Sequence, residues 1–222
     1  MLAPLLAAVL ALQTLAAVPQ AGPRYVEHCN PCSIVLRDGT PPADFRFELE
    51  SGPQGRVVKA IVFERSGHTV QKLEVPSMTP LAQDQSFFFG GQEINFDGWL
   101  DLLFMTEQGA ANAEAEYWVY DPAADRFRDL GRFPMFRADA VHKRLSTYVS
   151  SGPAGLDFER HEYAFQGNDL VVMREETQKP SPTRPGRWIR TVRRRKRGKL
   201  VVILRQTVKQ PARPKPVGSE SE

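Results

Sequence analysis

The C-terminal third of the chain contains an internal repeat that predicts β-hairpins. Residues 170–177 read Leu-Val-Val-Met-Arg-Glu-Glu-Thr, and thirty positions later residues 200–207 read Leu-Val-Val-Ile-Leu-Arg-Gln-Thr. Each copy follows a turn that contains glycine, at Gly167 and Gly198, and a strand-like segment stands before each turn. The pattern therefore predicts two consecutive β-hairpins built on one plan.

Strand signals recur along the rest of the chain, whereas helix signals are scarce. Residues 45–50 alternate between apolar and polar side chains, as a half-buried strand does. Segments 57–64 and 69–75 flank a hairpin turn, and the strand-like segment 116–120 ends at Asp121, which begins a turn with the following proline. The sequence predicts an all-β fold, an antiparallel hairpin meander with a propeller-like arrangement; a β-sandwich is the alternative.

The N-terminal segment is typical of a secretory signal. Residues 1–23 contain no charged side chain, and residues 2–18 are almost wholly Leu, Ala and Val. Polar residues and Pro19 interrupt the apolar run, which argues against a stable membrane span. We expect residues 1–21 to be a signal peptide and the mature protein to be periplasmic or secreted, without a membrane span.

Cys29 and Cys32 are the two cysteines of the chain, with the spacing C-x-x-C. A redox dithiol requires a strand–helix context, and a zinc half-site requires a second Cys or His pair. The simplest interpretation is a local disulfide formed in an oxidising compartment, with the intervening Asn30 and Pro31 making the turn.

Oxygen donors recur along the segment 92–102 in the order that a calcium loop uses. The candidate ligands are Glu93, Asn95, Asp97, the carbonyl group of Trp99, and Asp101. Gly98 occupies the sixth position, where such loops turn sharply, but Phe104 occupies the twelfth, where an EF-hand has glutamate. The segment predicts either a Ca²⁺ site or a tight turn in which the side chains of Asn95 and Asp97 bond their own backbone.

The net charge of +3 conceals an uneven distribution. Residues up to 179 include 16 Lys and Arg against 24 Asp and Glu, and the residues after 179 include 13 against 2. Basic residues gather at the tip of the second repeated hairpin, and the candidates for anion binding are Arg193, Arg194, Arg195, Lys196 and Arg197. In an exported protein the expected ligands are anionic wall or lipid polymers or an acidic partner, and nucleic acid is not expected. The alternative is a solvated surface that protects an edge strand from aggregation.

The remaining features define the domain and the class of protein. Residues 24–209 are expected to form one all-β domain, and residues 210–222, rich in Pro, Ser and charge, a disordered tail. The four histidines lie in dissimilar contexts, and the chain contains no G-x-S-x-G turn and no glycine-rich nucleotide loop. We therefore expect a binding protein rather than an enzyme.

The segment 92–102, together with Tyr-Trp-Val-Tyr-Asp-Pro at 117–122 and Asp-Arg-Phe at 125–127, resembles a family of exported bacterial proteins. In that family an I-N-F-D-G-x-x-D-L segment precedes a Y-W-x-Y-D-P hairpin. The strand pattern at 158–176 also resembles the hairpin that follows in the family. The loop is similar to those of calcium-binding β-propeller repeats.

The resemblance implies a propeller-like fold in the periplasm, often with bound calcium. It assigns the cation to Asn95, Asp97 and Asp101, whereas Glu93 replaces the usual aspartate. Some members of the family are immunity proteins that block the cleft of a peptidoglycan hydrolase delivered by a rival's type IV secretion system. The implied partner is a cell-wall hydrolase. The alternative is a calcium-stiffened envelope protein that binds anionic wall or lipid polymers through its basic hairpin.

Overall fold

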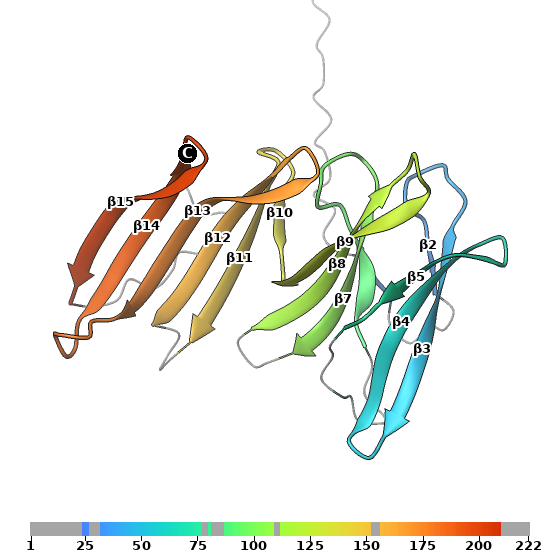
Figure 1. Cartoon of the computed structure of the whole chain (residues 1–222), viewed down its shortest axis with the longest axis horizontal. Helices are drawn as coiled ribbons and strands as arrows, with labels where there is room; N and C mark the ends of the chain where they lie inside the picture. The colour runs from blue at the N-terminus through green and yellow to red at the C-terminus, as the bar shows by residue number, and fades with distance from the viewer. Residues whose placement is uncertain are drawn as a thin grey trace, which may run out of the picture.

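The computed structural model describes residues 24–26, 32–76, 80, 87–108, 112–151 and 156–209. Within these residues every regular element is a β-strand, and the strands form three antiparallel sheets (Figure 1). The predicted all-β hairpin meander is therefore confirmed. The predicted signal peptide and C-terminal tail lie outside the described residues. In the described part of the chain, no helix has the length and apolar character needed to cross a membrane.

The first sheet contains four strands in the order of the chain. They are β2 (Cys32–Ile34), β3 (Ala43–Gly52), β4 (Gly55–Arg65) and β5 (His68–Glu74). The period-two pattern predicted for β3 matches its burial, which alternates over its first half. The turn between β4 and β5 is tight because Ser66 and Gly67 both have positive φ, at 49° and 77°.

The second sheet has the strand order β1-β6-β7-β8-β9. It lies between the other two, since its strands contribute to both apolar cores (Figure 1). Its strands are β1 (Arg24–Val26), β6 (Phe89–Gln92), β7 (Asp101–Gln108), β8 (Ala113–Asp121) and β9 (Arg126–Pro134). In β8 the residues from 115 to 120 are buried without interruption. A strand with alternating side-chain directions shows this pattern only when both faces of its sheet are covered.

The third sheet contains the two repeated hairpins and has six strands in chain order. They are β10 (Arg137–Asp139), β11 (Arg144–Ser151), β12 (Asp157–Gln166), β13 (Asp169–Pro180), β14 (Trp188–Lys196) and β15 (Lys199–Val208). The repeat is confirmed, since β12–β13 and β14–β15 are successive hairpins. Both belong to one sheet, because β13 also pairs with β14.

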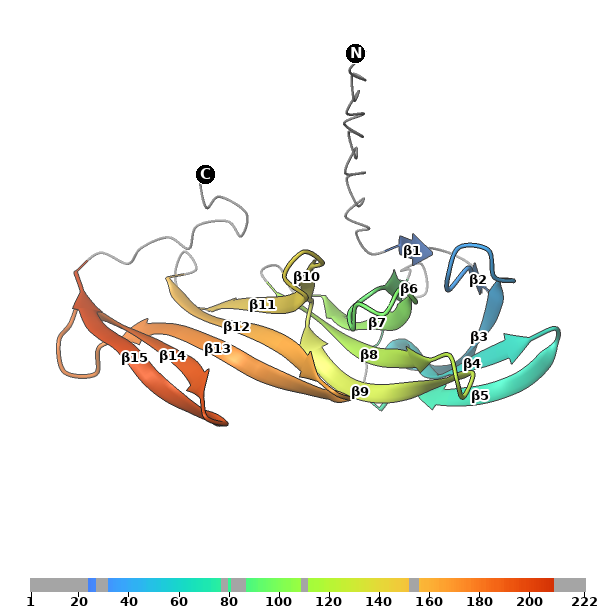
Figure 2. The same ribbon diagram turned by 90° about the horizontal axis from the view of Figure 1, so that it is seen from above.

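Two apolar cores join the sheets face to face. One core lies between the first and second sheets and includes Phe45, Phe63, Phe104 and Trp118. The other contains Leu103 and Tyr117, which neighbour two of these residues along β7 and β8, together with Leu145 and Tyr163 of the third sheet. The three sheets follow one another along the longest axis of the molecule (Figures 1 and 2). The described strands therefore form a row of separate antiparallel sheets built from hairpins.

Candidate functional site

The loop 93–100 connects β6 to β7 and is held by hydrogen bonds between its own residues. The N–H group of Asp97 donates to Oδ1 of Asn95 at 3.2 Å, and the N–H group of Trp99 donates to Oδ1 of Asp97 at 2.9 Å. The N–H group of Gly98 donates to Oε1 of Glu93 at 2.6 Å. These are the bonds of a tight Asx turn, so the turn conformation predicted from Asn95 and Asp97 is confirmed.

Asp101, the first residue of β7, holds this loop through hydrogen bonds of its side chain. Its side chain is buried, with the whole residue 0% exposed. Oδ2 accepts the N–H groups of Ile94 and Asn95 at 2.9 and 3.2 Å, and Oδ1 accepts the N–H group of Tyr120 at 2.9 Å. One carboxylate therefore joins the loop to β8. Burial raises the pKa of Asp101 to about 7, although the three N–H donors favour the ionised form.

The predicted calcium ligands take part in hydrogen bonds within the loop and with β8. Ca²⁺ requires six to eight oxygens that converge on one point. In this structure both oxygens of Asp101 accept buried backbone N–H groups, and oxygens of Glu93 and Asp97 accept N–H groups of the loop. Among the described residues, no group of three or more His, Cys, Asp or Glu side chains is placed to hold a metal ion. Calcium binding stays a prediction that this arrangement does not support.

The exposed end of the loop is fixed against its neighbours. The ring of Trp99 lies 5.3 Å from the ring of Tyr120, and the guanidinium group of Arg37 lies 5.2 Å from the Trp99 ring. The N–H group of the next residue, Leu100, donates to the carbonyl of Leu36 at 2.8 Å. Asp97 and Gly98 remain exposed at the tip. The loop therefore exposes the carboxylate of Asp97 to solvent, while the contacts described above hold its backbone in place; we refer to residues 93–101 as the braced loop.

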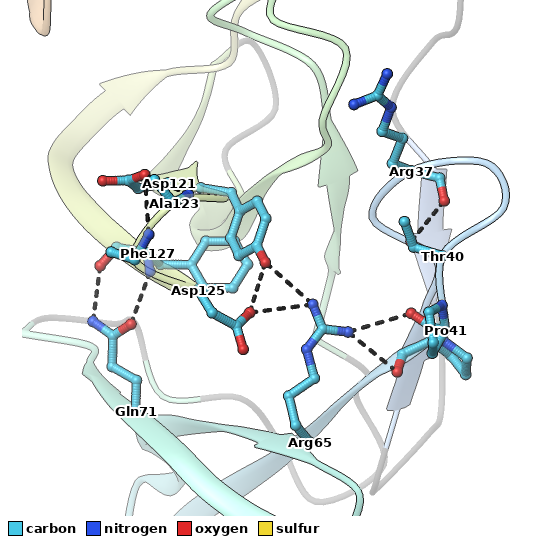
Figure 3. A network of polar contacts seen from close by, with 12 residues as sticks. Arg37, Thr40, Pro41, Arg65, Gln71, Asp121, Ala123, Asp125 and Phe127 are labelled. Atoms are coloured by element: carbon cyan, nitrogen blue, oxygen red, sulfur yellow. Dashed lines mark hydrogen bonds and ion pairs between the residues drawn. The ribbon is translucent and has the colours of Figure 1, made fainter.

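The second segment of the resemblance joins the central sheet to the first sheet (Figure 3). The hydroxyl of Tyr120 donates to Oδ1 of Asp125 at 2.6 Å. Arg65 of β4 donates to that hydroxyl at 3.2 Å and to Asp125 at 3.3 Å. A second nitrogen of Arg65 donates to the carbonyl of Pro41 at 3.2 Å. The Tyr-Asp-Pro hairpin thus forms part of the contact between sheets, and the residues that carry the resemblance maintain the fold.

The basic hairpin divides into residues that have partners and residues that do not. Arg193 forms an ion pair with Glu175, and Arg195 donates to the carbonyls of Val172 and Gly198 at 2.8 and 2.5 Å. The other three predicted residues are exposed and have no side-chain partner among the described residues: Arg194, Lys196 and Arg197. Lys199 and Arg205 of β15 add to this exposed charge. The prediction missed Arg205 because it followed the density of basic residues around the turn rather than their position on the sheet.

Cys32 lies in the core between the first two sheets and is 1% exposed. Cys29 lies outside the described residues. Their pairing as a local disulfide stays a prediction.

The fold defines this molecule as an all-β protein of three stacked sheets. No family model matches this chain, and no curated protein matches it. A solved structure described as a Xanthomonas type IV secretion system related protein superposes on it with a TM-score of 0.50 and 11% sequence identity. The match covers 81% of this chain and 99% of that chain. At this identity the likeness shows that the two proteins share a fold.

Proposed function

We propose that this protein is a non-enzymatic exported binding protein that inhibits a peptidoglycan hydrolase, as a periplasmic immunity protein does. The resemblance of segments 92–102 and 117–127 to a family that includes such proteins supports the proposal. The fold shared with a protein described as related to a type IV secretion system agrees with it. The match extends over almost the whole of that protein and over 81% of this chain.

The braced loop 93–101 is the observation that carries the proposal. A loop that is ordered before binding loses little conformational entropy when it enters a cleft. Asp97 is exposed at the tip, while Trp99 and the buried Asp101 hold the backbone behind it. Peptidoglycan carries carboxylates on its peptide stems, and the carboxylate of Asp97 would occupy the place of one of them in the cleft.

A charge-removing double variant tests this role while keeping the backbone bonds of the turn. Asn and Gln keep an oxygen that accepts the N–H groups of Trp99 and Gly98, so Glu93→Gln with Asp97→Asn removes the charge and loses only the bond that the side chain of Asn95 donates to Oδ2 of Asp97. Asp121→Asn is the matched control, because Asp121 accepts the N–H group of Ala123 in another exposed turn. The assay follows the lysis of purified peptidoglycan by lysozyme-type hydrolases, beginning with any encoded beside this protein.

The unchanged protein should inhibit one of these hydrolases stoichiometrically. The double variant should raise the inhibition constant about tenfold or more, which corresponds to about 1.4 kcal/mol, because the charge that complements the cleft is lost. The control at Asp121 should inhibit as the unchanged protein does. The proposal is wrong if the protein inhibits none of the hydrolases. If the double variant inhibits at full strength, another surface blocks the enzyme.

A further inference from the structure

β15 forms an open edge of the third sheet. It pairs with β14 on one side, and no described strand pairs with its other side. The edge strands β1, β2 and β10 have three residues each, whereas β15 has ten. The remaining edges, β5 and β9, are joined to each other where Gln71 bonds the backbone of Phe127. Among the described strands, β15 therefore offers the longest row of backbone groups without a neighbouring strand.

The usual protection of an edge strand is confined to parts of β15, with charged side chains at Lys199 and Arg205 and a bulge at Ile203. Proteins block such edges with prolines, charged side chains or short strands. Residues 200–204 are five consecutive apolar residues. Four of them are substantially exposed: Val201 by 36%, Val202 by 54%, Ile203 by 46% and Leu204 by 40%. Exposed apolar side chains beside unpaired backbone groups mark a surface on which another strand can pack.

The charge of this part of the molecule determines which strand fits. Residues 180–209 include eleven Lys and Arg and no Asp or Glu. Glu176 and Glu175 of β13 neutralise Arg190 and Arg193. The exposed basic residues of β14, β15 and the turn between them that have no side-chain partner among the described residues are Arg194, Lys196, Arg197, Lys199 and Arg205. A second copy of β15 would bring an equally positive hairpin to this edge, which like-charge repulsion disfavours.

We propose that β15 accepts an extended, acidic segment of another polypeptide as an additional strand of the sheet. Backbone hydrogen bonds along the edge would provide affinity, and alternate side chains would provide specificity. Apolar side chains of the segment would cover Val202 on one face of the sheet or Leu204 on the other, since the extra residue Ile203 turns these two exposed side chains to opposite faces. Its carboxylates would pair with the basic residues that lack partners, such as Arg194 and Arg197. This inference is independent of the inhibition assigned to the loop 93–101.

The test uses a fluorescent peptide of about ten residues in which glutamate alternates with valine, titrated against the protein and followed by anisotropy. A second peptide has the same side chains but N-methyl groups on alternate amides, so its backbone cannot pair with β15. A third has lysine in place of glutamate. The strand proposal predicts that the second and third peptides bind at least tenfold more weakly than the first.

Two protein variants test the position of the site. Arg194→Gln, Lys196→Gln and Arg197→Gln together remove three charges at the hairpin, and this variant should bind the first peptide several-fold more weakly. The matched control removes three exposed charges elsewhere, with Arg126→Gln, Lys143→Gln and Arg144→Gln, and should bind it as the unchanged protein does. Circular dichroism confirms that both variants are folded. If both variants bound the first peptide equally weakly, the effect would come from net charge, and the proposed site on β15 would be wrong.

Three further outcomes would overturn the inference. Equal binding of the N-methylated peptide would show attraction by charge without strand pairing. Binding of lipopolysaccharide or polyphosphate at least as tightly as the peptide would identify an anionic polymer as the ligand. Concentration-dependent dimers in sedimentation, abolished by Val202→Lys, would show that a second copy covers the edge. None of these outcomes affects the hydrolase assay, because that assay depends on Glu93 and Asp97.

Discussion

Asp101 uses a single buried carboxylate to hold three backbone N–H groups from two parts of the chain. Ile94 and Asn95 belong to the loop, and Tyr120 belongs to β8, nineteen residues along the chain. Burial disfavours the ionised carboxylate and raises its pKa to about 7, and the nearby charge of Asp97 acts in the same direction. The residue therefore makes the stability of the protein depend on pH.

The sign of this dependence follows from linkage. In the unfolded chain the carboxyl group loses its proton near pH 3.8, and in the folded protein it does so near pH 7. Between these values the folded state holds the extra proton, so the free energy of unfolding falls as pH rises, by about 4 kcal/mol across the window. Asp101→Asn should remove this slope. It should also destabilise the protein by about 1–3 kcal/mol, because an amide cannot accept all three N–H groups.

Urea denaturation of both proteins from pH 4 to pH 8 measures the effect, since other groups titrate equally in each. Asp121→Asn is the control for the removal of an exposed carboxylate and should retain the slope of the unchanged protein, because Asp121 is not among the groups that shift the pKa of Asp101. An equal slope in Asp101→Asn would contradict the assignment.

At the scale of residues, the sequence predicts the turn but not what its carboxylates bind. Asx turns and calcium loops both place oxygen side chains at alternate positions, because both need acceptors that face inward. Here the distinction depends on Asp101, whose side chain contacts the N–H group of Tyr120. That contact exists only because β8 pairs with β7. It therefore cannot be predicted from the sequence of the loop alone.

At the scale of elements, Gln71 joins the edges of two different sheets. Its side-chain amide donates to the carbonyl of Phe127 at 2.8 Å, and its oxygen accepts the N–H group of the same residue at 2.8 Å (Figure 3). Phe127 lies in the core between the first two sheets. The side chain of Gln71 thus forms the two backbone hydrogen bonds with Phe127 that a neighbouring strand would otherwise form.

Gln71→Met should lower the free energy of unfolding by about 1–3 kcal/mol, because it leaves a buried N–H group and a buried carbonyl without partners. The amide of Phe127 should also exchange with solvent faster. Gln206→Met is the matched control, since Gln206 is exposed on β15 and should tolerate the change within about 0.5 kcal/mol. Thermal denaturation and hydrogen exchange measure both effects. Equal losses in the two variants would show that the double hydrogen bond contributes nothing.

Most strands were predictable, because alternation of side chains reports burial directly. β3 and the hairpin of β4 and β5 agree with the predicted segments within a few residues. The start of β8 was not predicted: the strand-like segment was expected to begin at residue 116, and β8 begins at Ala113. Its apolar residues occur without alternation because both faces of the sheet are covered, and period alone does not separate such a strand from a buried helix.

At the scale of the whole molecule, the stacking of sheets produces two regions of different stability. β7 and β8 contribute side chains to both cores, since Leu102 and Trp118 belong to one and Leu103 and Tyr117 to the other. At the far end of the third sheet, Val192 is the buried residue of β14, and seven consecutive residues of β15 are exposed. This end is held mainly by backbone pairing, and its positive charges repel one another.

Hydrogen exchange should therefore distinguish the two regions. Amides of β7 and β8 should exchange only through global unfolding, whereas those of β15 should exchange through local opening, on the order of a hundredfold faster or more. Salt should narrow this difference, because screening weakens repulsion among exposed charges such as Arg194 and Arg197 while leaving the buried cores unaffected. Mass spectrometry of peptic fragments at low and high ionic strength provides the measurement. Equal protection of the amides of β8 and β15 from exchange would mean that another contact covers the edge. Protection of the β15 amides that appears only when the acidic peptide is present would show that the peptide binds on β15.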